Sequence, residues 1–144
     1  MKLSPLQLHE YFVTEFHFTL NSSYDPNLDT QLVLDELDAV TECKLVNDDL
    51  RRWVVTLELK YQPAVETNTP YIFSLGIVGM FEVMQEFEET KVKRIVSTNG
   101  PSVLFGVVRE IVREQTARGP AGAIVLPSPS FLPDEPIEPS VKPS

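Results

Sequence analysis

The sequence predicts an α+β fold in which three or four long antiparallel strands pack against one long helix. Segments with alternating apolar and polar residues come first, and a single segment with helical spacing follows them. Strands that precede a helix, instead of alternating with helices, are typical of α+β proteins with antiparallel sheets. The length of 144 residues corresponds to about one domain.

The first expected element is a long strand over residues 6–20. Its even-numbered positions are mostly apolar and its odd-numbered positions mostly polar, which is the period of a strand with one buried face. Tyr11 and Val13 are exceptions, because they place apolar side chains among the polar ones. Residues 21–26 then predict a loop.

The middle of the chain predicts at least one further strand and a turn. Residues 30–46 fit a helix in their first part and a strand in their second part, and residues 47–49 predict a turn. Residues 52–62 alternate cleanly from Trp53 onward, with Val54 as the one misfit. This segment is therefore predicted to be a strand.

Residues 71–83, after a connection over 63–70, predict a strand that is apolar on both faces. Two apolar faces indicate that the strand is covered on both sides by a helix, a partner subunit or a ligand. Gly76 and Gly79 indicate a bulge or a close approach of the backbone to another segment.

The one expected helix covers residues 101–118, with Pro101 in its first turn and Gly119 at its exit. Its apolar stripe contains Leu104, Val107, Val108, Ile111 and Val112 and is widened by Val103 and Phe105. A stripe this broad exceeds what packing on one sheet requires. We therefore expect the helix to be buried from two sides, through association of subunits.

The last residues differ from the rest in composition. Six of the 12 prolines fall in the last 18 residues. We expect a folded domain over residues 1–131 and a Pro-rich, acidic, disordered tail over residues 132–144.

The charge and the cysteine content exclude several classes of protein. A net charge of −9 argues against a nucleic-acid binder and against a polybasic lipid-binding surface. No apolar run is long enough to span a membrane, and the early His9 and Glu10 do not fit a signal peptide. With Cys43 as the only cysteine, no internal disulfide can form, and a reducing cytoplasm is the expected compartment.

The sequence contains no recognisable catalytic motif. It has no phosphate-binding glycine loop and no G-x-S-x-G elbow, and Cys43 has no histidine nearby in sequence. His9 and His17 lie eight residues apart in one strand, too far to share a metal ion. We expect neither an enzyme nor a metal or other cofactor. A polar pocket around Cys43 or either histidine would favour an enzyme.

The aromatic residues are more numerous than one sheet and one helix can bury. The surplus predicts a subunit interface or an open apolar groove.

Three blocks of the sequence resemble the SecB family in their order and spacing. Residues 99–110 resemble the family's helix signature, residues 79–81 its Gly-Ile-Phe, and residues 118–131 its Arg-Gly and Leu-x-Leu-Pro-Pro-Val-Asn-Phe. The resemblance covers residues 6–131.

This resemblance implies a cytoplasmic, ATP-independent export chaperone. The implied subunit is a four-stranded antiparallel sheet with a long helix and a shorter C-terminal helix, and the implied assembly is a homotetramer built as a dimer of dimers. Non-native polypeptides would bind in apolar grooves and pass to SecA. The expected client-binding residues are Trp53, Tyr71, Phe73, Phe81 and Phe105, with Phe12 and Phe16 as alternatives. Glu15 and Ile72 fit the SecA-docking positions, whereas Thr19 and Ser74 stand where the family has acids.

The chain also departs from the family. Gly106 and Val107 replace a proline and an aromatic residue of the helix signature, and Pro133 and Pro136 forbid the family's second helix. The weakened SecA surface favours, as an alternative, a SecB-like chaperone dedicated to one antitoxin segment of a toxin–antitoxin system. A protein that uses the fold for assembly alone is a further alternative.

Overall fold

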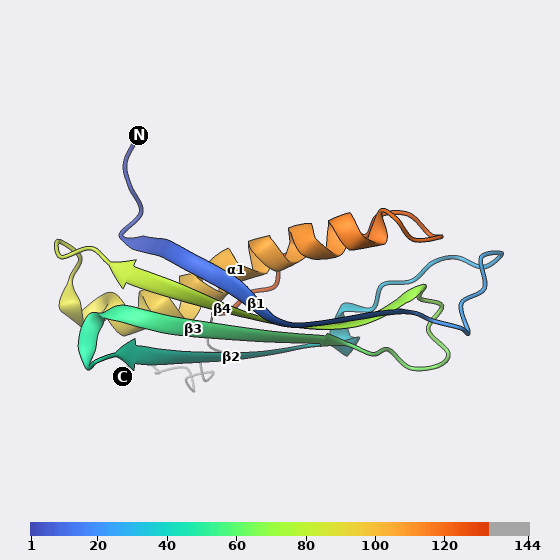
Figure 1. The fold of residues 1–144 in the computed structure, drawn as a ribbon, viewed down its shortest axis with the longest axis horizontal. Coiled ribbons are helices and arrows are strands. Elements are labelled where there is room, and N and C mark those ends of the chain that lie inside the picture. The colour runs from blue at the N-terminus through green and yellow to red at the C-terminus, as the bar shows by residue number, and fades with distance from the viewer. Residues whose placement is uncertain (133–144) are drawn as a thin grey trace, which may run out of the picture.

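The computed structural model describes residues 1–132, which form a single curved sheet with a long helix along one face (Figure 1). The strands are β1 (Leu6–Leu20), β2 (Leu37–Val46), β3 (Asp49–Tyr61) and β4 (Tyr71–Val83), and the helix is α1 (Val92–Thr116). Short 3-10 turns at Leu34–Glu36 and Glu89–Lys91 precede β2 and α1. The strand order is β1-β4-β3-β2, and all neighbours are antiparallel. The predicted α+β class and the four-stranded sheet are confirmed.

A two-residue turn joins β2 to β3. Asn47 and Asp48 have φ angles of 51° and 58°, so both adopt the left-handed conformation that a type I′ hairpin turn requires. Asparagine and aspartate tolerate this conformation better than most residues. The turn expected at residues 47–49 is therefore present, and the ambiguous segment before it resolves into the strand β2.

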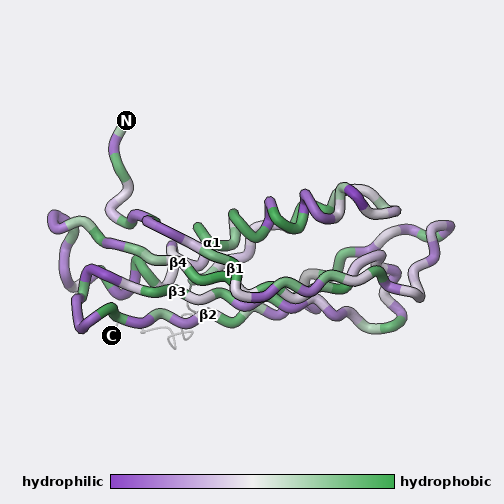
Figure 2. Tube along the Cα trace, viewed as in Figure 1, coloured by the Kyte–Doolittle hydropathy of each residue, from purple (hydrophilic) through white to green (hydrophobic). Residues whose placement is uncertain are grey.

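The core lies between the sheet and α1. Alternate residues of β3 and β4 point toward the helix, and Figure 2 shows apolar and polar residues alternating along the strands. We call this side of the sheet the helix side and the opposite side the outer face. The buried apolar residues of the two central strands are Trp53, Val55, Leu57, Leu59, Tyr61, Tyr71, Phe73, Leu75, Ile77, Phe81 and Val83.

The helix begins nine residues earlier than its sequence predicted. Pro101, expected in the first turn, is a buried residue in the helix interior. A proline there has no N–H to donate to the carbonyl four residues earlier. The first part of the helix is held instead by burial of Val92, Val96 and Gly100, which follow one another at four-residue spacing on the side facing the sheet.

The strand β1 changes face twice. Its pairing with β4 shifts register between Leu8 and Glu10 and again between Val13 and Glu15. Each bulge adds one residue, so the side chains that follow it point to the opposite side. Between the bulges Tyr11 and Val13 therefore lie on the helix side, opposite Gly79 and Ile77, while Phe12 lies on the outer face. These shifts explain the exceptions to the alternation in residues 6–20.

After α1 the chain turns over residues 117–121 and then continues without regular secondary structure to Leu132, where the description ends. Residues 133–144, which make up most of the expected tail, lie outside the described residues. The domain boundary expected at residue 131 stays a prediction. No helix within residues 1–132 is long and apolar enough to cross a membrane.

Two glycine substitutions are expected to change stability in opposite directions. A Cβ atom at Gly79 would lie 2.7 Å from Leu104 Cδ2 and 2.8 Å from Phe81 Cε2, whereas a Cβ atom at Gly106 meets nothing within 4 Å. Gly79→Ala should therefore lower the free energy of unfolding by about 1–3 kcal/mol through overpacking. Gly106→Ala should raise it by about 1 kcal/mol, because alanine favours helix. Urea unfolding of both variants measures these changes, and a neutral Gly79→Ala would contradict this packing of α1 over β4.

Candidate functional site

The residues with catalytic or metal-binding potential lie in separate surroundings. Burial, together with the nearby Glu42 carboxylate, raises the pKa of the Cys43 thiol and so disfavours a thiolate. His9 Nε2 lies 2.7 Å from a carboxylate oxygen of Glu82, and His17 Nε2 lies 3.0 Å from one of Glu15. Residues 1–132 contain no group of three or more side chains that could hold a metal ion.

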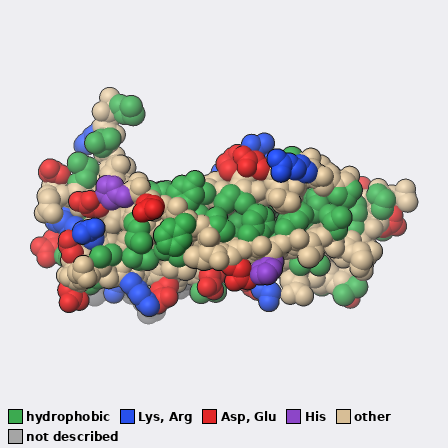
Figure 3. Space-filling view, in the orientation of Figure 1, with side chains coloured by type: hydrophobic (Ala, Val, Ile, Leu, Met, Phe, Trp, Pro, Cys, Tyr) green, Lys and Arg blue, Asp and Glu red, His purple; other side chains and the backbone are tan. Residues whose placement is uncertain are grey.

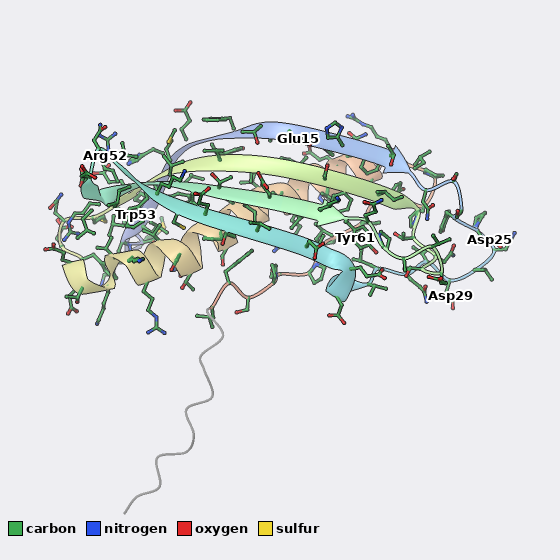
Figure 4. The ribbon with its side chains drawn as sticks, turned by 90° about the horizontal axis from the view of Figure 1, so that it is seen from below. Glu15, Asp25, Asp29, Arg52, Trp53 and Tyr61 are labelled. Atoms are coloured by element: carbon green, nitrogen blue, oxygen red, sulfur yellow. The ribbon has the colours of Figure 1, made fainter. Side chains whose placement is uncertain are left out.

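Five of the seven aromatic residues expected to bind a client are core residues of the subunit. Trp53, Tyr71, Phe73, Phe81 and Phe105 are each at most 5% exposed. Two of them also satisfy their polar atoms internally. The Trp53 indole N–H donates to the Leu50 carbonyl at 2.6 Å, and the Tyr71 hydroxyl lies 3.2 Å from the Thr116 carbonyl oxygen. Figure 4 shows Trp53 and Tyr61 near the two ends of β3.

The structure therefore corrects the expectation that these five side chains are exposed in a groove. They pack between the sheet and α1, where a client could reach them only if the core opened. The expectation failed because a large apolar residue in an alternating strand has the same pattern whether its face meets a helix or an open groove.

The other two expected residues, Phe12 and Phe16, reach the surface on opposite sides of β1. Phe12 is 45% exposed and lies on the outer face. Phe16 is half-buried on the helix side, where its ring meets that of Phe18 edge-on with centroids 6.3 Å apart. The second bulge separates the two phenylalanines and places them on different surfaces.

Phe12 belongs to an apolar cluster on the outer face, which we call the outer patch. Phe12 pairs with Val78 across β1 and β4, and Met80 pairs with Val54 across β4 and β3. All four side chains are at least partly exposed. Sequence reasoning did not name Val54, Val78 and Met80 as site residues, although Val54 broke the alternation of its strand and the other two made β4 apolar on both faces.

A second apolar surface follows the free edge of β1. Tyr11 and Val13 are 48% and 40% exposed. On α1, Val103, Val107 and Ile111 form a partly exposed stripe at four-residue spacing. Figure 3 shows hydrophobic side chains gathered in a band along the middle of the face that carries β1 and the adjoining side of α1. We call these five residues the edge band.

The residues expected to dock SecA lie on the outer face but not together. Glu15 lies beside Gly76, whereas Ile72 lies beside Thr19, which is four residues further along β1. Glu15 borders a hollow of about 470 Å³ whose other charged lining residues are Asp38, Glu58 and Lys60. The surface around Glu15 is therefore mainly acidic.

A single sheet backed by one helix, with apolar side chains exposed along the free edge of β1, is typical of a subunit that associates with other polypeptides. The comparisons with known proteins are more specific. The family model described as preprotein translocase subunit SecB matches residues 6–131. The chain belongs to the SecB family, and the resemblance found in its sequence is confirmed.

Individual relatives agree with this assignment at low identity. A protein-export protein SecB of Rhodospirillum centenum is 23% identical over 134 residues, covering 89% of this chain and 76% of the relative. A protein-export protein SecB of Anaplasma phagocytophilum is 32% identical over 65 residues, covering 44% of this chain and 41% of its own length.

Two solved structures share the fold. A Mycobacterium tuberculosis SecB-like chaperone, Rv1957, in complex with a ChAD peptide from the HigA1 antitoxin superposes with a TM-score of 0.58 at 18% identity, covering 88% of this chain and 91% of that one. A Streptococcus agalactiae protein of unknown function gives a TM-score of 0.51 at 14% identity, covering 85% and 96% of the two chains.

Proposed function

We propose that this chain is a chaperone of protein export that acts in the cytoplasm and holds non-native polypeptides without nucleotide, cofactor or covalent chemistry. Membership of the SecB family supports the chaperone class. The observation that carries the holding mechanism is the outer patch, where Phe12, Val54, Val78 and Met80 expose apolar surface on the face away from the helix.

Apolar burial supplies the binding free energy in this proposal. Covering exposed apolar surface contributes about 25 cal/mol per Å² and does not depend on direction. A cluster of phenylalanine, valine and methionine can therefore accept many different apolar segments, because methionine adapts its shape to its partner. An extended client can also add backbone hydrogen bonds at a free sheet edge.

The edge band supports assembly into a homotetramer built as a dimer of dimers. The free edge of β1 offers unpaired backbone groups to a second copy, and a two-fold axis makes such a contact self-complementary. Pairing of β1 with its counterpart would bring two outer patches together into one longer apolar surface. The α1 stripe of Val103, Val107 and Ile111 would then be covered by a second dimer.

Client contact is assigned to Phe12 and Phe16, the two expected aromatic residues that reach the surface. Trp53, Tyr71, Phe73, Phe81 and Phe105 support that surface from within the core. SecA docking through Glu15 and Ile72 remains part of the proposal, since both residues lie on the outer face and the acidic surroundings of Glu15 suit a basic partner.

A second candidate function is a chaperone dedicated to one antitoxin segment. The SecB-like neighbour from Mycobacterium tuberculosis, which shares this fold, is described in complex with an antitoxin peptide. Co-purification of this chain with a single bound protein, and failure to hold unrelated clients, would distinguish this function from general export.

The general function is tested by adding the purified full chain to a denatured client that aggregates on dilution. We expect near-stoichiometric amounts to suppress aggregation without nucleotide, and light scattering to give four times the chain mass of 16.3 kDa. A folded tetramer that leaves aggregation unchanged would contradict general holding. A folded monomer would contradict the proposed assembly.

A further inference from the structure

After α1 the chain runs back along the helix in the opposite direction. The Ile124 N–H donates to Thr116 Oγ1 at 2.8 Å, near the end of the helix. Further along, the Phe131 ring lies 6.2 Å from the ring of Phe105, which precedes Thr116 by eleven residues. Eleven helical steps cover about 17 Å, a length that the seven steps from residue 124 to 131 can cover only if the chain is extended. We call residues 124–131 the extended segment.

The middle contact of the extended segment joins a serine hydroxyl to an arginine of the helix. Arg109 Nη2 donates a hydrogen bond to Ser128 Oγ, and the Ser128 side chain is exposed. The Arg109 guanidinium also lies over the Phe105 ring, 5.8 Å from its centroid, and this contact helps to fix its position. A positioned positive charge therefore faces an accessible hydroxyl group.

One edge of this guanidinium is only half used. In arginine the Nε–H and one Nη2–H point the same way and can bind two oxygens of one anion. Arg113 does so, because its Nε and Nη2 both donate to one carboxylate oxygen of Glu110, at 3.1 and 2.9 Å. On the same edge of Arg109, Nη2 meets Ser128, but Nε is buried and has no hydrogen-bond acceptor within residues 1–132. The edge therefore has room for an anion at the position of Ser128.

We propose that Ser128 is a phosphorylation site and that Arg109 binds the resulting phosphoserine. A protein serine kinase would transfer the γ-phosphoryl group of ATP. A bond forms between Ser128 Oγ and the γ-phosphorus, and the bond from that phosphorus to the β,γ-bridging oxygen breaks. ADP leaves with that electron pair, and the hydroxyl proton passes to a base of the kinase. The product carries a charge of about −1.5 to −2 and three acceptor oxygens, which can fill the edge formed by Arg109 Nε and Nη2.

The surroundings of Ser128 suit a modifying enzyme. The serine lies in a part of the chain without helix or strand, so an enzyme can reach it without unfolding either. Pro127 and Pro129 have no N–H groups and favour an extended backbone on both sides of it. Phosphorylation would fasten the extended segment, which carries the buried Leu126, to α1. The proposal is independent of the proposed function, since it requires neither a client nor an assembly.

Phosphoserine installed at position 128 of the full chain by genetic-code expansion tests the contact. The Ile124 amide, which bonds to Thr116, should exchange its hydrogen with solvent about tenfold more slowly than in the unmodified chain, because charge-assisted hydrogen bonds hold the segment. Phosphoserine at position 130 is the matched control. Ser130 is exposed in the same segment, but its Oγ accepts the Leu132 N–H, so Ile124 exchange should not change. No slowing at position 128, or equal slowing at both positions, would overturn the proposal.

Arginine variants separate a paired guanidinium from general charge attraction. In the chain with phosphoserine at position 128, Arg109→Lys keeps the charge but loses the planar fork, so Ile124 exchange should return close to its unmodified rate. Arg113→Lys should leave the slowing in place, because Glu110 already occupies that guanidinium. By ³¹P titration, the second pKa of phosphoserine, ordinarily about 6, should be lower at position 128 than at position 130, because Arg109 favours the dianion. Slowing that survives Arg109→Lys would overturn the role of Arg109.

Mass spectrometry tests whether the modification occurs in cells. The full chain is purified from the cells that produce it, in growth and in stationary phase, with phosphatases inhibited. We expect a fraction of the molecules to carry phosphate on Ser128 and none to carry it on Ser130. Absence of phosphate from Ser128 in both phases would overturn its assignment as a modification site.

Discussion

Replacing Phe12 with aspartate is expected to weaken client binding by about tenfold or more while leaving the fold intact. Phe12 is 45% exposed and is the member of the outer patch on the edge strand β1, so a bound client would cover its ring. Burial of a phenylalanine side chain is worth about 1.5–3 kcal/mol, and each 1.4 kcal/mol changes a dissociation constant about tenfold. Fluorescence anisotropy with a labelled apolar peptide measures the change directly.

Thr19→Asp is the matched control for this experiment. Thr19 is exposed on the same strand and the same outer face, but it lies beside Ile72 and outside the outer patch. It adds the same charge, so an equal loss in both variants would show that charge alone is responsible. Unchanged peptide binding by Phe12→Asp, with normal circular dichroism, would contradict the role of the outer patch.

Replacing Phe105 with alanine is expected to lower the free energy of unfolding by about 3–5 kcal/mol, as for other large buried aromatic residues. The ring is 1% exposed, stacks at an angle with Phe131, and lies below the Arg109 guanidinium at 5.8 Å. Removing it leaves a cavity between α1, the sheet and the extended segment. Urea unfolding monitored by circular dichroism gives the change.

Val103→Ala provides the comparison on the same helix. Val103 is 42% exposed, so its truncation should cost well under 1 kcal/mol within the subunit. A cost for Phe105→Ala as small as that for Val103→Ala would mean that the Phe105 ring does not belong to the core. Its original assignment to a client-binding groove would then regain support.

The strands could be predicted because their side chains alternate with a period of two. The limits expected for residues 6–20 and 71–83 are those of β1 and β4. The face of each β1 side chain could not be predicted, because a bulge is a property of two paired strands. Tyr11 and Val13 broke the alternation of their strand. The sequence of one strand does not show whether such exceptions are apolar side chains that point outward or side chains that a bulge has turned to the other face.

The start of α1 was missed for a local reason. Residues 97–101 have the composition of a loop, and Pro101 is also favoured in the first turn of a helix. Burial against the sheet outweighed these preferences, because tertiary contacts override weak local propensity. The helical spacing of Val92, Val96 and Gly100 was visible in the sequence and indicated the longer helix.

The candidate site was less predictable than the fold. Sequence identified which residues are large and apolar, but their burial depends on how far α1 extends over the sheet. Five expected aromatic residues therefore proved to be core, and the exposed Val54, Val78 and Met80 were not named. The separation of Glu15 on β1 from Ile72 on β4 likewise depends on register, which follows from the pairing of the two strands.

The order of the strands has a consequence for the synthesis of this protein. The β2–β3 hairpin closes through a two-residue turn, so it can form within microseconds of leaving the ribosome. The strand β1 is made before its partner β4 and must wait for it, since 50 residues separate the end of β1 from the start of β4. During that interval both edges of β1 are unpaired and its phenylalanine side chains are uncovered. Segments of this kind aggregate readily. The nascent chain therefore passes through a stage in which it resembles the non-native polypeptides that it is proposed to hold.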